Sequence, residues 1–217
     1  SVRKFSSIGQ FTYLEDSAGR LSTRVTDGEF AVEYQNSDRF SVGINQDYEL
    51  LVRPFTVVPR AVVPVGGYEF TTGRIGYKMG TQRKVSGTFL LERGSFYNGN
   101  RTGLSVSGSR LNLSPQVSLE PSLSLNRFSL PTGDFSQTLA GSRITYTVTP
   151  LLFASALVQY NSSTHTVSTN ARMRWEYRPG SEFFIVYNEE RDSEAAAGAP
   201  GLFNRSIIVK VNRFLRF

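Results

Sequence analysis

The stretch that decides the fold is Ser206-Ile207-Ile208-Val209-Lys210-Val211-Asn212-Arg213-Phe214-Leu215-Arg216-Phe217, the last twelve residues of the sequence. Counted in twos from the end, one side is apolar except for Arg213 and consists of Phe217, Leu215, Val211, Val209 and Ile207. The other side carries Arg216, Asn212 and Lys210. Successive side chains of a β-strand point to opposite faces. The stretch therefore predicts a strand with one apolar and one charged face.

The same period of two runs through the rest of the chain, and helical periodicity is almost absent. Residues 168–177 show it best, with Thr169, Ala171, Met173, Trp175 and Tyr177 opposite Ser168, Asn170, Arg172, Arg174 and Glu176. Gly, Pro, Asn, Asp and Ser separate such segments. We expect twelve strands, near residues 4–14, 21–35, 40–51, 68–79, 84–93, 102–113, 117–126, 140–148, 152–160, 168–177, 182–190 and 205–217. A change of parity predicts β-bulges near Asp27-Gly28 and at Gly108.

Composition excludes several classes of protein. The 217 residues include no Cys, which excludes disulfides, thiolate metal sites and a Cys nucleophile. No run of eighteen apolar residues is present, so no transmembrane helix is expected. The net charge is +6, but the charges form no arm or cluster, which disfavours nucleic acid as a partner. The first residues lack an apolar signal segment, so we expect a mature chain or a fragment.

The strand pattern favours a membrane barrel over a soluble one. Expected connections alternate between short (near 36–38, 80–83, 114–116, 149–150 and 178–181) and longer (near 15–20, 52–67, 94–101, 129–135, 161–166 and 191–204). This alternation is typical of barrels with short periplasmic turns and longer external loops. An even strand number puts both termini on the periplasmic side, and tyrosines at strand ends fit interfacial girdles. A soluble lipocalin-like barrel or a sandwich is the alternative, and would have to bury the face that carries Trp175.

The predicted fold is therefore all-β, an antiparallel up-and-down transmembrane β-barrel of about twelve strands, as one domain over residues 1–217 in a bacterial outer membrane. A terminal aromatic residue is typical of outer-membrane barrels. It indicates a membrane-insertion signature formed by Val209, Val211, Leu215 and Phe217. The expected partners are outer-membrane lipid and the barrel-assembly machinery.

Several segments resemble one family of bacterial outer-membrane proteins. They are residues 155–161, 167–170, 174–181 and 186–188, with 94–99 and 130–135 earlier in the chain. The chain is similar to the C-terminal barrel of a family whose members often carry a carbohydrate-binding family 9-like domain in front of it. Because those members are much longer, the resemblance implies a C-terminal portion without the binding domain, in which the twelve strands either close by themselves or form part of a larger barrel. It also implies a saccharide as a ligand.

The charged faces of the strands supply the candidate functional residues. We expect a pore lined by Arg74, Lys78, Glu92, Glu120, Arg143, Arg172, Arg174, Glu176 and Lys210, joined by Arg216, Glu29, Glu33, Asp47 and Glu49. Mixed charge can set the selectivity of a pore, or it can pair internally and plug a narrow barrel. Two functions stay open. One is a porin-like channel or transporter for small polar solutes, and the other is a structural barrel that anchors or exports a preceding domain.

Catalysis is not expected. The single histidine, His165, lies three residues from Ser168, which places the two on opposite faces of a strand end. A hydrolase needs its nucleophile and base within hydrogen-bond reach. No cofactor is predicted. The acidic residues at strand ends, such as Glu189 and Asp192, favour solvated charge over a divalent metal site.

Overall fold

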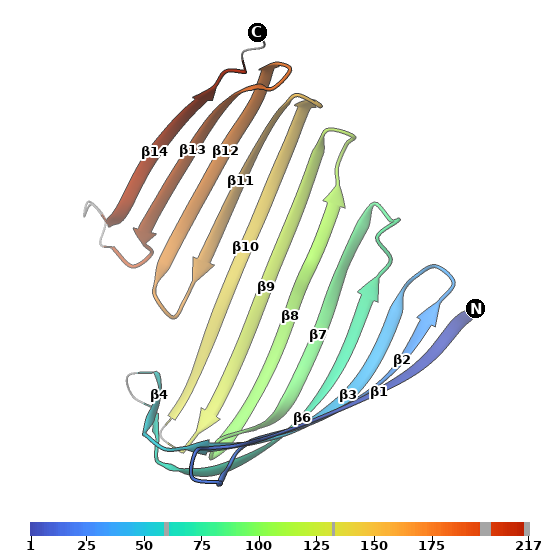
Figure 1. Ribbon diagram of the computed structural model, residues 1–217, viewed down its shortest axis with the longest axis vertical. Helices are drawn as coiled ribbons and strands as arrows, with labels where there is room; N and C mark the ends of the chain where they lie inside the picture. Colours follow the sequence, from blue (N-terminus) through green and yellow to red (C-terminus); the bar gives the residue numbers. More distant parts are fainter. Residues whose placement is uncertain (59–60, 132, 196–200, 215–217) are drawn as a thin grey trace. The chain divides into compact units, whose positions relative to one another are not determined.

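A computed structural model describes residues 1–58, 61–131, 133–195 and 201–214. Twelve strands form one antiparallel sheet in which each strand pairs with the next one along the chain, except that β4 and β5 form a separate hairpin (Figure 1). The described residues contain no helix, and hence none long and apolar enough to cross a membrane. The prediction of an all-β, up-and-down arrangement of twelve strands is confirmed. The strands are β1 (Val2–Glu15), β2 (Leu21–Tyr34), β3 (Arg39–Leu51), β4 (Phe55–Val58), β5 (Ala61–Val63), β6 (Gly66–Met79), β7 (Val85–Phe96), β8 (Gly99–Asn112), β9 (Val117–Leu130), β10 (Gly133–Thr149), β11 (Leu152–Asn161), β12 (Thr166–Arg178), β13 (Ser181–Asp192) and β14 (Leu202–Asn212).

Backbone contacts divide the chain into two compact units. Unit 1 comprises Ser1–Arg83, Gly87–Val106 and Ser124–Gln137, and unit 2 comprises Lys84–Ser86, Ser107–Leu123 and Thr138–Phe217. The order of pairing begins at β1 and ends at β14. A closed barrel would also need β1 to pair with β14, and that pairing is not among those of the described residues.

The register corrects one expectation about β2. Residues 23–33 of this strand pair with β3 without a shift, so the bulge predicted near Asp27-Gly28 is wrong. Val25 and Asp27 simply share a face, and Arg24 and Phe30 share the other. The apolar residues change parity because the first half of β2 mixes the two kinds of side chain: the apolar Val25 lies on the face of Asp27, and the charged Arg24 lies on the face of Phe30. Gly108 does adopt the left-handed conformation, φ 56°, that a bulge glycine needs.

Asp38 fixes the short turn between β2 and β3 against the turn that follows β6. Its side chain is buried, at 2% exposure. One oxygen accepts from the Gly80 N–H at 2.8 Å, and the other accepts from the Tyr77 hydroxyl and the Arg83 guanidinium at 2.7 Å each. The backbone bond from Gly80, helped by Tyr77, lowers the pKa of Asp38 below its usual value. Two neighbouring turns are thus tied together by one carboxylate.

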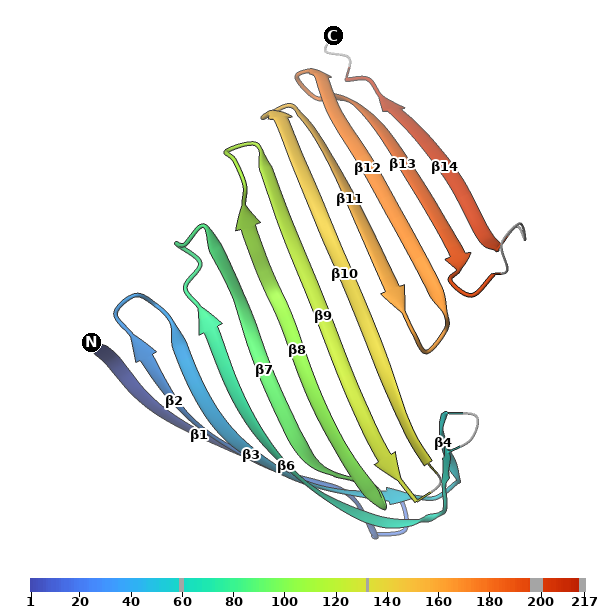
Figure 2. The same cartoon turned by 180° about the vertical axis from the view of Figure 1, so that it is seen from behind.

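The connection from β3 to β6 holds a hairpin that sequence reasoning missed. Its prolines and glycines predict an irregular loop, yet Phe55 pairs with Val63 and Thr56 with Val62. In Figures 1 and 2, β4 lies beside the start of β10. Val63 is almost completely buried. Among the residues of unit 1 whose burial is described, the other buried apolar side chains are Ala31, Leu51, Phe128 and Leu130. This end of the sheet therefore carries most of the apolar core.

Two connections expected to be long are tight. Only Tyr97 and Asn98 separate β7 from β8, and residues 131–132 separate β9 from β10. Tyr97 adopts a left-handed conformation, φ 50°, which a tight hairpin turn requires. Long connections are therefore restricted to residues 52–65, which contain the hairpin, and residues 193–201. The predicted alternation of loop lengths is correspondingly weaker.

The C-terminal strand is shorter than predicted. β14 ends at Asn212, and neither Arg213 nor Phe214 is in strand conformation. Instead, the Phe214 N–H donates to the Ser181 hydroxyl at 3.0 Å, which directs the chain across the start of β13. Leu215, Arg216 and Phe217 lie outside the described residues.

Candidate functional site

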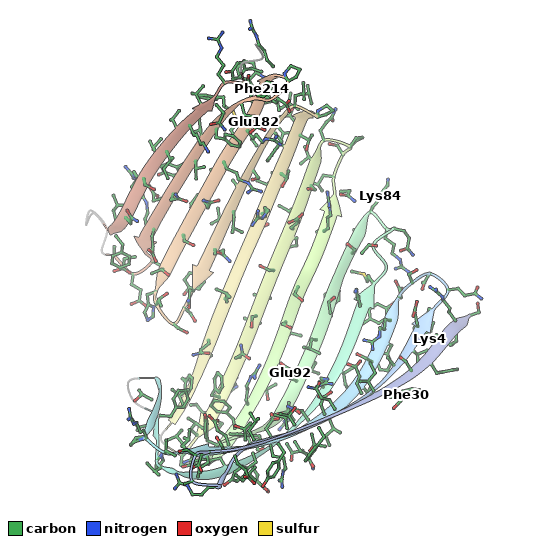
Figure 3. All side chains as sticks on the ribbon, in the orientation of Figure 1. Lys4, Phe30, Lys84, Glu92, Glu182 and Phe214 are labelled. Carbon is green, nitrogen blue, oxygen red and sulfur yellow. The ribbon has the colours of Figure 1, made fainter. Side chains whose placement is uncertain are left out.

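Unit 1 has one charged and one apolar sheet face. Residues that pair across an antiparallel sheet share a face. One row across β1, β2, β3, β6 and β7 consists of Ile8, Glu29, Gly43, Arg74 and Glu92. The adjacent row on the other face consists of Ser7, Phe30, Val42, Ile75 and Leu91. Phe30 and Glu92 are labelled in Figure 3.

Arg74 is the centre of an ion-pair network on the charged face. Its guanidinium donates to both carboxylate oxygens of Asp27, and its Nε lies 3.8 Å from Glu29. Arg39 binds the same Glu29. The side chains of Arg74 and Asp27 are only 23% and 22% exposed. The pairs are therefore partly screened from solvent and stronger than ordinary surface pairs.

Arg101 extends this network toward β9. It donates to Glu92 at 3.1 Å and to the Asn126 amide oxygen at 2.9 Å. We call the set formed by Asp27, Glu29, Arg39, Arg74, Glu92, Arg101 and Asn126 the charged belt. Beside it, one oxygen each of Asn45 and Asp47 is buried without a hydrogen-bond partner among the described residues. The belt can present alternating positive and negative charge to a polar solute.

Glycines make room for the belt. A Cβ at Gly43 would lie 2.6 Å from the Arg74 Nε, and one at Gly103 would lie 3.0 Å from the Asn126 amide oxygen. Separations this short need the guanidinium or the amide to move. The small residue under Arg74 thus allows its side chain to lie along the sheet and reach Asp27.

Unit 2 also has a charged face. Arg174 donates to Glu182 and lies 6.0 Å above the ring of Phe184. Arg172 donates to the Ser155 hydroxyl at 3.0 Å and lies 6.0 Å above Phe153. A guanidinium above an aromatic face is held by a cation–π interaction while its remaining donors stay available.

A row of amides and hydroxyls lies on the same face of unit 2. Asn170 donates to Asn188, which donates to the Ser206 hydroxyl at 3.2 Å. These residues adjoin a pocket of about 190 Å³, lined by Leu157, Gln159, Ser168, Thr169, Asn170, Asn188, Glu189, Glu190 and Asn204. Uncharged donors and acceptors at this density suit hydroxyl-rich solutes.

An aromatic cluster in unit 1 lies around Tyr97 and includes Phe55 of the β4–β5 hairpin. The Tyr97 ring contacts Phe55, Tyr68, Phe70 and Phe96, with centroids 4.8–5.7 Å apart. The Tyr97 hydroxyl donates to Glu49 at 3.0 Å. Burial, followed by this hydrogen bond, raises the pKa of Tyr97 to about 12. The phenol therefore stays protonated and holds Glu49 at neutral pH.

The predicted site residues lie on the charged faces. In unit 1, Arg74 and Glu92 belong to the belt, and Lys78 pairs in register with Arg39. In unit 2, the Arg143 Nε lies 4.0 Å from Glu120, and Arg172, Arg174, Glu176 and Lys210 share one face. The predicted insertion residues Val209 and Val211 lie on the opposite, apolar face, while Leu215 and Phe217 lie outside the described residues.

Sequence reasoning missed several members of the belt. The sequence predicts a bulge near Asp27 and a connection at Arg101, and therefore marks neither as a lining residue. The separation of two between Asp27 and Glu29, which places both carboxylates on one face of a strand, is the local signal that could have found Asp27. Arg101 needed the two-residue turn at Tyr97, which extends β8 back to Gly99.

His165 has a surface partner. Its Nδ1 lies 2.9 Å from Glu194 in the next connection, and both side chains are at least half exposed. Within the described ranges, no group of three or more His, Cys, Asp or Glu side chains could hold a metal ion.

Comparison with known proteins gives no relative: no family model, curated protein or solved structure matches the chain.

Proposed function

We propose that the chain forms a membrane-spanning β-barrel of the outer-membrane type that passes small polar solutes along its charged faces. The observation that carries this proposal is the distribution of large apolar side chains. Among the described residues, only five hydrophobic side chains are buried. Meanwhile Phe5, Phe11, Ile44 and Ile75 are 50–65% exposed on the apolar face of unit 1. Apolar patches of this extent mark membrane or protein interaction surfaces.

The arrangement of charge supports the same reading. A soluble sheet protein buries its apolar face and exposes its charges. Here the charged side chains bind one another across the sheet, between β2 and β3 and, over β3, between β2 and β6. The opposite face offers Phe30, Val42 and Ile75 to the surroundings. That is the arrangement expected of a barrel wall with lipid outside and water inside.

The strands are long enough to cross a bilayer. The twelve sheet strands have 10–17 residues each, and a tilted membrane strand needs about 9–11. Both end strands are exposed along almost their whole length. A long, unpaired apolar edge is an aggregation hazard that closure removes. Because the strand number is even, β1 and β14 run antiparallel and can pair.

The side chains of unit 2 point to the solute class. The pocket near Asn170 and Asn188 is lined mainly by amides and hydroxyls, together with Glu189 and Glu190. Such groups recognise hydroxyl-rich, uncharged molecules by hydrogen bonds. Saccharides are therefore the solutes we propose.

A structural barrel without transport is the second candidate. It is favoured by the pairing within the charged belt, where Arg39, Arg74 and Arg101 all bind carboxylates. A narrow lumen filled by such pairs would be closed to solutes, and the barrel would then serve to anchor or export another domain.

Two experiments test the proposal. The chain is refolded in detergent, its folding is checked by mobility on unheated gels, and single-channel conductance is recorded in a planar bilayer. Steady open-pore steps support transport, whereas a folded but silent protein supports the structural alternative.

Closure is tested by disulfide formation, since the native chain has no Cys. Gln10→Cys is combined in turn with Ser206→Cys, Ile208→Cys or Lys210→Cys, and with Thr145→Cys in β10 as a control. One β1–β14 pair should form an intramolecular disulfide, because paired strands bring Cβ atoms within about 5.5 Å. If all of these pairs stay reduced in the folded protein, the twelve strands do not close on themselves.

A further inference from the structure

A groove runs along the apolar face of unit 2. Its floor is made by three small side chains, Ala154, Ala156 and Ala171, on β11 and β12. Tyr146 of β10 lies on one side, and Ile185 and Tyr187 of β13 lie on the other. The groove has a volume of about 330 Å³. Alanines between larger neighbours thus leave a channel on a face that otherwise carries bulky apolar residues.

A pair of arginines lies at one end of this groove. Tyr187, which lines the groove, donates its hydroxyl to Glu189. Glu189 in turn binds Arg191 and Arg205, the latter at 2.7 Å from Nη2. In register, Arg205 pairs with Glu189, and Ile207 pairs with Tyr187, so the arginine lies one row beyond the groove on the same face.

The cluster carries a surplus of positive charge. The Glu189 side chain is only 12% exposed, whereas those of Arg191 and Arg205 are 52% and 46% exposed. Two guanidinium groups share one carboxylate, which leaves one net positive charge. Each guanidinium has five N–H donors. The two guanidinium groups together therefore have more donors than the Glu189 carboxylate can accept hydrogen bonds from. The exposed donors are thus held in place by a sheltered anion and directed at the surroundings.

We propose that the groove holds one acyl chain of an anionic, phosphate-bearing membrane lipid whose headgroup is bound by Arg191 and Arg205. The inference rests on the membrane function proposed above. Apolar walls with almost no polar atoms suit a hydrocarbon chain, and arginine suits phosphate because its planar fork can make two parallel hydrogen bonds. An apolar groove that ends at a pair of arginines favours a lipid over a free phosphate, because a free phosphate would bind the arginines and leave the apolar groove empty.

The single Trp, Trp175, reports on this site. It lies on the same face, two residues beyond Met173, which lines the groove. Thr169 pairs with Glu189 in the row of the arginines and is six residues from Trp175, about 20 Å along the strand. Bromine atoms in the middle of a lipid chain bound in the groove would therefore quench Trp175 fluorescence.

The experiment uses the refolded chain in phosphatidylcholine vesicles. A small fraction of the lipid is either dibromo-phosphatidylglycerol or dibromo-phosphatidylcholine, and insertion is checked by flotation after a carbonate wash. We expect the anionic probe to associate about fivefold more strongly, the ratio that one net positive charge near an anionic lipid surface produces. Arg191→Gln with Arg205→Gln should abolish the preference, and Ala171→Leu should do so by filling the groove. Arg178→Gln, which removes a charge at the other end of β12, should retain it.

The outcomes separate the two proposals. Equal quenching by both probes in a protein that floats overturns the lipid site but not the barrel. Weak quenching by both in a protein that floats also overturns it, because no lipid chain then lies close to Trp175. A folded protein that fails to float overturns the membrane function itself. Preference that survives both Ala171→Leu and the double arginine variant shows that the lipid binds elsewhere.

Discussion

Replacing Arg74 with Gln tests whether the charged belt is held together by coupled ion pairs. Arg74 makes two charge-assisted hydrogen bonds to Asp27. Removing one partner of a fully buried pair costs about 3–5 kcal/mol, while exposed pairs contribute about 0–1 kcal/mol. Side-chain exposures of 23% and 22% lie between these limits. We therefore expect Arg74→Gln to lower the free energy of unfolding by about 2 kcal/mol.

The assay is a double-mutant cycle measured by urea unfolding of the refolded protein. Asp27→Asn alone should also destabilise, because Arg74 then keeps only Glu29, 3.8 Å away. The double variant should lose less than the sum, with a coupling of at least about 1 kcal/mol. The pair Arg3–Glu33, with exposures of 61% and 32%, serves as the control, and its coupling should stay below about 0.5 kcal/mol. Additivity of the Arg74 and Asp27 losses within about 0.5 kcal/mol would refute this account of the belt.

Three further predictions concern stability. Phe128→Ala should lower the free energy of unfolding by about 3–5 kcal/mol, because it removes a ring that contacts two others. Phe11→Ala, at a position 65% exposed, should lower it less in detergent, and equal losses would contradict the placement of the core. The pKa of the Asp38 carboxylate is lowered in the folded state, so the carboxylate contributes to stability above pH 3.8, its ordinary pKa, and this contribution is lost as the pH falls further. Asp38→Asn should therefore flatten the acid limb of a curve of stability against pH. An unchanged limb would show that this carboxylate does not contribute to stability. Gly94→Ala should weaken the pairing of β6 with β7, measured as faster hydrogen exchange of their amides, because the new Cβ would lie 2.2 Å from the Thr71 carbonyl oxygen. Unchanged protection would show that the backbone shifts there at little cost.

Much of the fold could be predicted from the sequence because alternation is a local property. The strand from Thr166 to Arg178 shows its two faces in its own residues, and its predicted bounds are nearly right. The apolar side of β14 follows in the same way from Ile207, Val209 and Val211. These predictions need no knowledge of which strand is the neighbour.

What the sequence could not predict depends on contacts between strands. The β4–β5 hairpin is short, it lies between Pro54 and Pro64, and its Val63 is almost completely buried. The membership of Arg101 in the belt depends on the two-residue turn Tyr97–Asn98, whose first residue contacts the rings of Phe70 and Phe96. The candidate site therefore appears only when the register places β2, β3, β6, β7 and β8 next to one another in that order.

The order of pairing has a consequence for how the chain reaches its folded state. Every sheet strand pairs with the next one along the chain, and only the β3–β6 pairing skips the hairpin. Such a topology has low contact order, so successive hairpins can add to a growing sheet without long loop closures. Each intermediate nevertheless carries an open edge, and in the proposed barrel β1 cannot pair with β14 before the last strand has been made. We expect the pairing of β1 with β14 to be the slow step in folding. The species most prone to aggregation should be the sheet in which these two strands are not yet paired.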